Sequence, residues 1–432
     1  MAIVLESLVK IVFMFLLIMG MVPALIWAER KGAAYIQDRT GPNRASIAGV
    51  RLAGLVHPIA DVLKLVFKED IAPTNRHRAL YSLAPWLVMT IAVSTYAVIP
   101  FGDYLEVGGK RFPLVVADLQ VGLLYVLAVA SLGTYGVVLG GWAANNKFTF
   151  LGGIRATAQM ISYEISMGLA IMGLMLVFGT LRLTDIVAGQ GGLLFGFLPM
   201  WGVVLQPLGF VLFITAVYAE TNRNPFDLPE GESEIVAGYH LEYSSLRFAL
   251  FFMAEYAAMI VGSAVTATLF FGGYSVPFLT GEAIRQNADL IVMILGVGGA
   301  VSLPVAAVLA WRRRNIRFYQ ALPPGDARLT EPKFWAVVWL GAAAAHAGLA
   351  ALGGLHLVSS VAIGPEIVAF LLQVTSLAVK VLLGTFFMIW IRWTLPRFRY
   401  DQVMNLGWRY MLPLALANVL VAGLWIALTQ HG

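Results

Sequence analysis

Long apolar stretches separated by short polar loops run through the whole chain. Each stretch holds about 18 residues or more with few charges, enough for an α-helix to cross the hydrocarbon core of a bilayer. Helices satisfy their own backbone hydrogen bonds, as a lipid environment requires. The pattern predicts an all-α, polytopic transmembrane helical protein with a single integral membrane domain over residues 1–432. The predicted spans, about ten, cover residues 11–28, 79–99, 118–140, 156–180, 199–219, 246–271, 288–310, 334–358, 366–391 and 409–428.

The first apolar stretch admits a second interpretation, a cleaved signal peptide. Glu6 does not suit the basic start of such a peptide, and no small-residue cleavage motif follows the stretch. The stretch instead ends in Glu29, Arg30 and Lys31, as a retained span does. We therefore expect it to be a membrane span.

Basic residues are unevenly distributed between the two sets of loops. One set holds most of the 29 Lys and Arg residues, whereas the loops of the other set hold Lys110, Arg111, Arg182 and Arg285. Because basic residues accumulate in cytoplasmic loops, we expect the first set to be cytoplasmic and both termini to lie outside. The first set comprises loops 29–78, 141–155, 220–245, 311–333 and 392–408.

Composition narrows the possible chemistry. The sequence is 59% apolar and 12% charged, and it contains no cysteine. Iron–sulfur clusters and c-type haem are normally attached through cysteine, so we expect neither in this chain. The six histidines show no spacing typical of a metal site. The net charge of +5 does not indicate nucleic-acid binding, because the basic residues lie at predicted membrane edges.

The first polar loop, residues 29–78, contains an amphipathic segment. His57, Asp61, Lys64 and Lys68 recur at helical spacing, with apolar residues on the opposite face. This pattern predicts a helix that lies in the membrane interface. Such a helix often anchors a protein to anionic lipid, but Asp61 on the same face as the two lysines favours a specific polar contact. Both interpretations remain open at this point.

Two predicted spans carry acids deep inside. Glu164 and Glu255 each lie about 12–13 Å from the end of their helix, at 1.5 Å per residue. A charged carboxylate at this depth costs on the order of 3 kcal/mol and needs a partner, water or a proton. Either acid alone is equally well explained as a structural hydrogen-bonding group. Together with Glu220 at the end of a third span, they favour a path for protons. Lys380 also lies near mid-membrane, where it could pair with an acid.

The loop over residues 220–245 is acidic, with Arg223 as its one basic residue. One explanation is a docking surface for a basic partner. The other is coupling, because carboxylates in a low-dielectric cleft respond strongly to a nearby change of charge. Pro225 and Pro229 disfavour a helix and hold Phe226 and Asp227 in an extended turn. The acids of the loop are Glu220, Asp227, Glu230, Glu232, Glu234 and Glu242.

Three segments resemble one known family. Residues 220–230 read Glu-Thr-Asn-Arg-Asn-Pro-Phe-Asp-Leu-Pro-Glu, and the first loop contains the turn Gly-Pro-Asn-Arg at 41–44. Residues 390–402 read Trp-Ile-Arg-Trp-Thr-Leu-Pro-Arg-Phe-Arg-Tyr-Asp-Gln. In this order the segments resemble the H subunit of respiratory complex I, the proton-translocating NADH:quinone oxidoreductase. The matching parts cover residues 1–271 and 366–428.

The resemblance implies a quinone-site membrane subunit that couples quinone reduction to proton translocation. It places quinone-channel residues at Glu29, Arg30, Gln37, Arg39, Asp61, Lys64, Arg223, Phe226 and Asp227. It places the coupling path at Glu164, Glu220, Glu230, Glu232, Glu234 and Glu255. Possible charge partners are Arg397, Arg399 and Lys380.

The resemblance also implies what surrounds the chain. Quinone would be the substrate, FMN and iron–sulfur clusters would lie on partner subunits, and the isolated chain would not be catalytic. We expect as partners the peripheral quinone-site subunits, small neighbouring membrane subunits and membrane lipid, in the inner membrane of a bacterial cell.

Two features depart from the family pattern. His57 stands where the family usually has glutamine, which affects only the hydrogen bonding at the helix entry. Residues 285–365 add two apolar stretches around a basic cluster, which we interpret as an inserted, peripheral helical hairpin. Two extra spans preserve the sidedness of later loops, so we expect that removing them leaves quinone chemistry largely intact.

Two other functions compete with this interpretation. The nearest is the homologous membrane subunit of a membrane-bound hydrogenase or of another quinone-reducing dehydrogenase. A different class is an autonomous ion transporter, which is disfavoured because the sequence has no internal repeat. The genes beside this one would discriminate between these classes.

Overall fold

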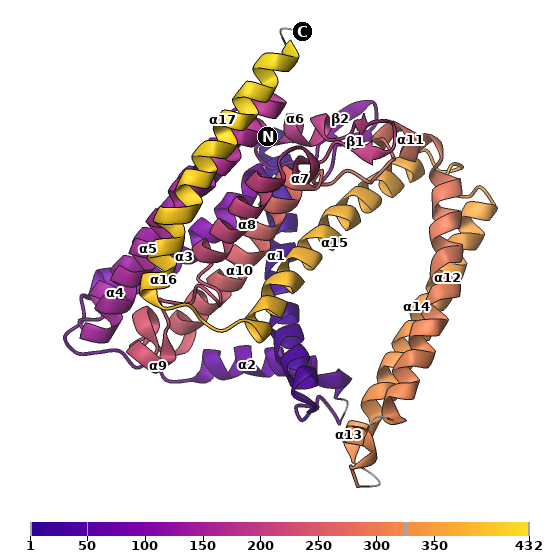
Figure 1. Ribbon diagram of the computed structural model, residues 1–432. Helices are drawn as coiled ribbons and strands as arrows, with labels where there is room; N and C mark the ends of the chain where they lie inside the picture. Colours follow the sequence, from indigo (N-terminus) through magenta and orange to yellow (C-terminus); the bar gives the residue numbers. More distant parts are fainter. Residues whose placement is uncertain (1, 50, 316, 324–325, 431–432) are drawn as a thin grey trace.

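The computed structural model describes residues 2–49, 51–315, 317–323 and 326–430, and it consists almost entirely of helices (Figure 1). Within these ranges nine helices are long and apolar enough to cross a membrane, so the prediction of a polytopic all-α protein is confirmed. They are α1 (Ala2–Ile36), α3 (Arg78–Ser94, extended by a 3₁₀ turn at Thr95–Val98), α4 (Gly122–Ala143), α5 (Lys147–Phe178), α10 (Ser245–Phe270), α12 (Ala288–Arg312), α14 (Glu331–Gly354), α15 (Gly364–Thr394) and α17 (Leu412–Gln430, continuing from α16, Tyr400–Asn405, through a π-helical turn at Leu406–Met411).

The span expected over 199–219 is shorter than predicted. It consists of one turn, α7 (Gly202–Leu205), and the 14-residue helix α8 (Pro207–Glu220). Gln206 between them has φ −136° and ψ 63°, because a residue before proline is driven out of the helical region. At 1.5 Å per residue, α8 spans about 21 Å and does not cross a hydrocarbon core of about 30 Å by itself.

The two ends of the helix bundle differ in character (Figure 1). Both chain termini lie at one end. The opposite end, which we call the motif end, carries the three segments with the family motifs. The terminal end carries α6 (Leu183–Gly189), α11 (Gly281–Gln286) and two short antiparallel hairpins, β1 (Tyr104–Val107) with β2 (Lys110–Pro113) and β3 (Leu193–Leu194) with β4 (Leu198–Pro199). The motif end carries α2 (Val56–Phe67), α9 (Glu232–Ile235), a 3₁₀ turn (Gly238–His240) and α13 (Arg317–Gln320).

Helix α10 occupies the centre of the bundle. In its most apolar stretch 61% of residues are buried within the chain, against 17% in α12 and in α14. Its buried face contributes Ala257, Ile260 and Ala264, each fully enclosed, to the main apolar core. An acid on α10 is therefore held inside protein, where neighbouring helices decide its partners.

Helices α12 and α14 form a pair at the side of the bundle, drawn in orange in Figure 1. Glycine allows their backbones to approach closely: a Cβ atom on Gly296 would lie 2.3 Å from the backbone nitrogen of Ala350. The pair turns at the motif end through α13, and 3₁₀ turns at Arg313–Asn315 and Ala327–Thr330 flank that helix. We call residues 285–365 the side hairpin.

Helix α2 lies across the motif end and connects α1 towards α3 (Figure 1). Its apolar residues Ile59, Leu63 and Phe67 are exposed, with Phe67 at 84%. Its entry is held by His57, whose Nε2 accepts from the backbone nitrogens of Arg44 and Ala45 at 3.4 Å while Nδ1 lies 3.2 Å from the Gly54 oxygen. One neutral tautomer of the imidazole satisfies all three contacts.

Candidate functional site

Arg223 is the centre of a buried charge cluster at the motif end. Its side chain is 2% exposed, and its Nε lies 2.8 Å from a carboxylate oxygen of Glu255 on α10. Its Nη1 lies 3.3 Å from Glu29 on α1. The Arg392 guanidinium on α15 also donates to Glu29, and the Tyr256 hydroxyl donates to Glu29 at 2.8 Å. The Arg223 guanidinium stacks 4.3 Å from the centroid of the Tyr256 ring.

Local backbone geometry brings Arg223 to this position. Helix α8 ends at Glu220, and Asn222 then adopts φ 51°, a left-handed conformation that asparagine tolerates better than most residues. The Gln159 amide on α5 fastens this turn, because its Nε2 donates to the Ala219 oxygen at 2.8 Å and to Asn222 Oδ1 at 3.1 Å. The chain direction therefore reverses, and Arg223 points into the bundle.

The cluster balances its charge. Two arginines, Arg223 and Arg392, face two carboxylates, Glu29 and Glu255, so that no single charge is buried without a counterion. Breaking such a buried pair by removing one partner typically costs about 3–5 kcal/mol. The cluster therefore joins α1, α10, α15 and the acidic loop into one unit.

Two acids of the acidic loop, Asp227 and Glu230, lie close enough to Glu255 of this cluster for their charges to interact. Burial, followed by the charge of Glu255, raises the pKa of Asp227 to about 7, although the Arg397 guanidinium acts in the opposite direction. Arg397 Nη1 lies 3.9 Å from the Asp227 carboxylate. Burial and the charge of Glu255 also raise the pKa of Glu230 well above its usual value. Both groups can therefore hold a proton under conditions in which an exposed carboxyl group is ionised.

His240 is the neighbour of Glu230, at 3.5 Å between Nδ1 and a carboxylate oxygen. Burial lowers the pKa of His240 to about 4, so the imidazole is neutral at pH 7. Gly238 makes this contact possible: it has φ 60°, and a Cβ there would lie 1.6 Å from the Pro229 oxygen. Only glycine allows the two sides of the loop to approach this closely.

A partly open cavity of about 140 Å³ leads from this region into the bundle. Apolar residues of α3, α4, α5, α8 and α10 form most of its wall. Three acids from different segments, Glu220, Glu230 and Glu255, line the same space. Because water takes about 30 Å³ per molecule in the liquid, the cavity has room for a short chain of waters between these carboxylates.

Glu164 extends the series of acids along α5. Its carboxylate accepts a hydrogen bond from the Ser131 hydroxyl on α4, and it lies close enough to Glu220 for their charges to interact. The acids Asp227, Glu230, Glu255, Glu220 and Glu164 thus form a series from the motif end into the helix bundle.

Residues of the first loop make a second, more exposed set of contacts. Arg30 pairs with Asp61 on α2, and Lys64 lies 3.6 Å from the same carboxylate. Gln37 accepts from Arg39 Nε at 2.7 Å, and both are exposed. Asp61 therefore has a specific partner on α1, which the lipid-anchor interpretation of α2 does not explain.

Several candidate residues lie apart from the series. Glu234 pairs with Arg155 at 2.5 Å on the surface, and Glu242 accepts from Asn146 at 2.5 Å. Arg399 is exposed, and its guanidinium lies 3.5 Å from the Asp401 carboxylate. The Glu232 side chain lies outside the described residues.

Phe226 and Lys380 also have contacts that differ from those expected. Phe226 is buried between the rings of Tyr163 and Phe398, at centroid distances of 5.3 and 5.4 Å, and is not among the cavity-lining residues. Lys380 donates to the backbone oxygens of Gly273 and Ser275 at 2.7 Å, beyond the end of α10. Its ammonium group also lies 5.7 Å from the centroid of the Trp201 ring. The sequence left two roles open for Lys380, pairing with an acid or shaping the electric field along a proton path.

Four site residues have no counterpart among the candidates from sequence: Arg392, Tyr256, His240 and Ser131. Arg392 and His240 lie within quoted motifs or the acidic loop, but their partners are 363 and 10 positions away in the chain. Sequence spacing does not show such contacts. No group of three or more His, Asp or Glu side chains placed to hold a metal ion occurs among the described residues.

Comparison with known proteins shows the family to which the chain belongs. The model of the NADH dehydrogenase family matches residues 9–423, nearly the whole chain. The chain belongs to this family. A protein of Solibacter usitatus, named as an H subunit of NADH-quinone oxidoreductase, is 41% identical over 98% of this chain and 97% of its own length. NADH-quinone oxidoreductase subunit 8 of Rhodothermus marinus is 40% identical over 94% of this chain and 92% of its own. The H subunit of Salinibacter ruber is 39% identical over 94% and 91%.

Proposed function

We propose that the chain is the quinone-site membrane subunit of a proton-translocating NADH:quinone oxidoreductase. The observation that carries the proposal is the series of carboxylates that begins beside Arg223 and enters the bundle through a shared cavity. In this proposal the motif end faces the cytoplasm of a bacterial cell, and the chain crosses its inner membrane. The other subunits supply the electrons, and the isolated chain does not catalyse the reaction.

The chemistry of quinone reduction fits this arrangement. A quinone that accepts two electrons also takes up two protons, so negative charge develops and then disappears beside the site. In a low-dielectric cleft, carboxylates a few ångströms away experience this change as several kcal/mol. Asp227, with its pKa raised to about 7, and Glu230, with its pKa raised well above its usual value by burial and the charge of Glu255, respond by binding or releasing protons.

In this proposal the charged residues of the first loop form the entrance to the quinone site. Arg30 pairs with Asp61 on α2, Gln37 contacts Arg39 in the loop that follows α1, and α2 exposes an apolar face. A long apolar quinone tail suits that face, and its polar head suits the charged side chains. Peripheral quinone-site subunits would cover the loop, and small membrane subunits would border the bundle.

Amide substitutions along the series test the proposal. Glu255→Gln and Glu164→Gln keep the size of the side chain and remove the proton site, so quinone reduction per assembled complex should fall at least about tenfold, because loss of a proton-transfer group typically costs about 10²–10⁴-fold. Glu164→Gln should assemble normally, whereas Glu255→Gln also takes a carboxylate from Arg223, so less of that complex should assemble. Glu106→Gln is the control, because Glu106 pairs with Arg111 at 3.1 Å in the β1–β2 hairpin at the terminal end. Assembly is followed on native gels, and quinone reduction and proton uptake are measured in membranes. Parental rates and parental proton uptake in both variants would exclude the proton path.

A further inference from the structure

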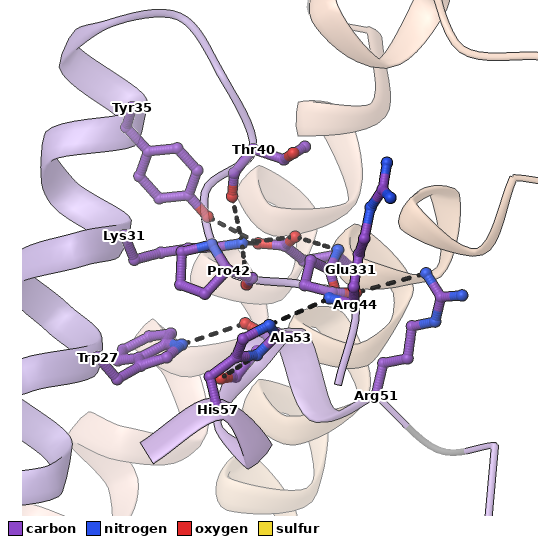
Figure 2. A network of polar contacts seen from close by, with 12 residues as sticks. Trp27, Lys31, Tyr35, Thr40, Pro42, Arg44, Arg51, Ala53, His57 and Glu331 are labelled. Atoms are coloured by element: carbon purple, nitrogen blue, oxygen red, sulfur yellow. Dashed lines mark hydrogen bonds and ion pairs between the residues drawn. The ribbon is translucent and has the colours of Figure 1, made fainter. Parts of the chain in front are cut away.

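A buried polar network ties the side hairpin to the first loop (Figure 2). The Glu331 carboxylate, at the start of α14, accepts from Lys31 Nζ at 2.8 Å, from the Tyr35 hydroxyl at 2.8 Å and from Asn43 Nδ2 at 2.9 Å. Glu331 and Lys31 are 2% exposed, and Asn43 is 3% exposed. The side hairpin, which we interpreted from the sequence as peripheral, thus reaches Lys31 in the first of the charged motifs.

Lys31 uses its full hydrogen-bonding capacity in this network. Besides Glu331, its ammonium group contacts the backbone oxygens of Thr40 at 2.7 Å and Pro42 at 3.5 Å (Figure 2). An ammonium group has three donors, and all three have acceptors here. Glu331 is the partner that supplies a full negative charge, and the two carbonyls belong to the turn at residues 40–44.

Aromatic contacts strengthen the same attachment. The Arg313 guanidinium of the side hairpin lies 4.5 Å from the Tyr35 ring centroid. The Trp335 ring on α14 lies 5.8 Å from that of Trp27 on α1, and Trp27 Nε1 donates to the Ala53 oxygen at 3.2 Å. The side hairpin thus contacts both the end of α1 and the loop that follows it.

Three consecutive residues of α1 bind three different parts of the molecule. Glu29 contacts the Arg223 cluster, Arg30 contacts Asp61 on α2, and Lys31 contacts Glu331 on the side hairpin. One helical turn therefore joins the charge cluster, the surface helix and the side hairpin. Any displacement at Lys31 is transmitted to Glu29 and Arg30 because they share that turn.

We propose that the side hairpin is a clamp on the first loop and that Glu331 is a positioning residue acting through Lys31. The clamp holds residues 37–55 and the end of α1 in register with the Arg223 cluster. Its effect on quinone rests on the proposed function, since that function makes the first loop the quinone entrance. The attachment itself does not depend on that function.

The test uses the purified whole complex with four variants. Glu331→Gln removes the negative charge, and Lys31→Gln removes the positive one. The double variant removes both and leaves no buried charge unpaired, which is the costly state in either single variant. Glu282→Gln is the matched control, because Glu282 is an exposed residue of α11 at the opposite end of the side hairpin.

Hydrogen exchange over residues 37–55 reports on the clamp, and quinone kinetics report on its consequence. In Glu331→Gln we expect exchange at least about tenfold faster, since local opening becomes easier. We also expect the KM for quinone to rise several-fold while NADH oxidation by a water-soluble acceptor is unchanged. The double variant should regain slow exchange and a lower KM, and Glu282→Gln should match the parent.

The outcomes separate the clamp from the proposed function. The clamp is contradicted if hydrogen exchange over residues 37–55 is unchanged in Glu331→Gln. It is also contradicted if exchange in the double variant is as fast as in Glu331→Gln. If Glu331→Gln does not assemble, recovery of assembly in the double variant supports the clamp and lack of recovery overturns it. A third outcome is faster exchange in Glu331→Gln together with unaltered quinone kinetics in both Glu331→Gln and Glu255→Gln. That outcome would support the clamp and contradict the proposed function.

Discussion

Arg223 shows how a single side chain determines the arrangement of several distant segments. Its guanidinium contacts α1 through Glu29 and α10 through Glu255, and it stacks on Tyr256. Each carboxylate would otherwise be a buried anion, and each is tolerated because Arg223 and Arg392 compensate it. The stability of the helix bundle and the positions of Glu29 and Glu255 therefore depend on the same residue.

Replacing Arg223 should damage assembly before chemistry. Arg223→Gln leaves Glu29 with Arg392 alone and Glu255 without its ion pair, so we expect several-fold less assembled complex. Arg223→Lys keeps the positive charge but replaces the planar guanidinium, whose N–H groups reach two carboxylates, with a single ammonium group. We therefore expect an amount of assembled complex between those of the parent and of Arg223→Gln. Quantitative native gels measure this, with Arg39→Gln as an exposed control. Parental levels in Arg223→Gln would mean that the cluster does not hold the helices together.

Asp227 gives a prediction about pH. Burial raises its pKa to about 7, so the folded protein holds this proton more tightly than the unfolded chain does. The resulting stabilisation is complete at low pH and is lost as pH rises through about 7. If Asp227 takes part in coupling, the rate of quinone reduction should change as this carboxyl group titrates near pH 7. Asp227→Asn removes the titrating group, so this change in rate should disappear. Proton uptake per assembled complex should fall at least as much as electron transfer.

The control for this experiment is Glu234→Gln, an acid of the same loop whose partner is the surface residue Arg155. It should keep the parental pH profile. If the loop only docks a basic partner, Asp227→Asn would instead weaken assembly, more so at high salt, with normal activity per complex. That result would contradict the coupling role of Asp227.

At the scale of elements, hydropathy predicts the long helices well and the interruptions poorly. The stretch over 199–219 is apolar throughout, yet Pro207 divides it into α7 and α8. The acidic loop was recognisable from its composition, but Phe226 turned out to be buried between Tyr163 and Phe398. Period and charge are local properties, whereas burial of a loop residue depends on which distant helices cover it.

The side hairpin gives a prediction about helix packing. A Cβ on Gly296 would lie 2.3 Å from the Ala350 backbone nitrogen, whereas one on Gly298 has no atom within 4 Å. Gly296→Ala should force α12 and α14 apart and lower the amount of protein in the membrane at least twofold. Gly298→Ala shares the gain in helix propensity, about 1 kcal/mol, and should reach the parental level. Equal levels on membrane immunoblots would contradict this packing.

At the scale of the whole molecule, the alternation of basic loops predicts that both termini lie on the outer side of the membrane, and in Figure 1 the two ends of the chain lie at the same end of the bundle. It did not reveal that Glu331 binds Lys31, 300 positions earlier. The charge of Glu331 in a basic loop gives no sign of a buried partner. Ion pairs between remote segments follow from three-dimensional packing, which a single sequence does not contain.

Deleting the side hairpin tests how that remote pair serves the molecule. The ends of the deletion are close, since the backbone nitrogens of Val358 and Ser359 donate to Asp289 at 3.1 and 3.3 Å. Removing residues 288–358 takes out two helices and keeps the sidedness of α15 and α17. It also leaves Lys31 without its carboxylate, so we expect low assembly and weak quinone reduction from the deletion alone.

Adding Lys31→Gln to the deletion should restore much of the assembled complex, because the uncompensated cation is gone while its two carbonyl contacts can still be met by an amide donor. Native gels and quinone reductase rates compare the deletion, the deletion with Lys31→Gln, and the deletion with Lys110→Gln as the charge-matched control, because Lys110 is exposed in β2 at the terminal end. Rescue by Lys31→Gln but not by Lys110→Gln is the expected result. If both substitutions rescue equally, or if the deletion alone is fully active, the side hairpin does not act through Lys31.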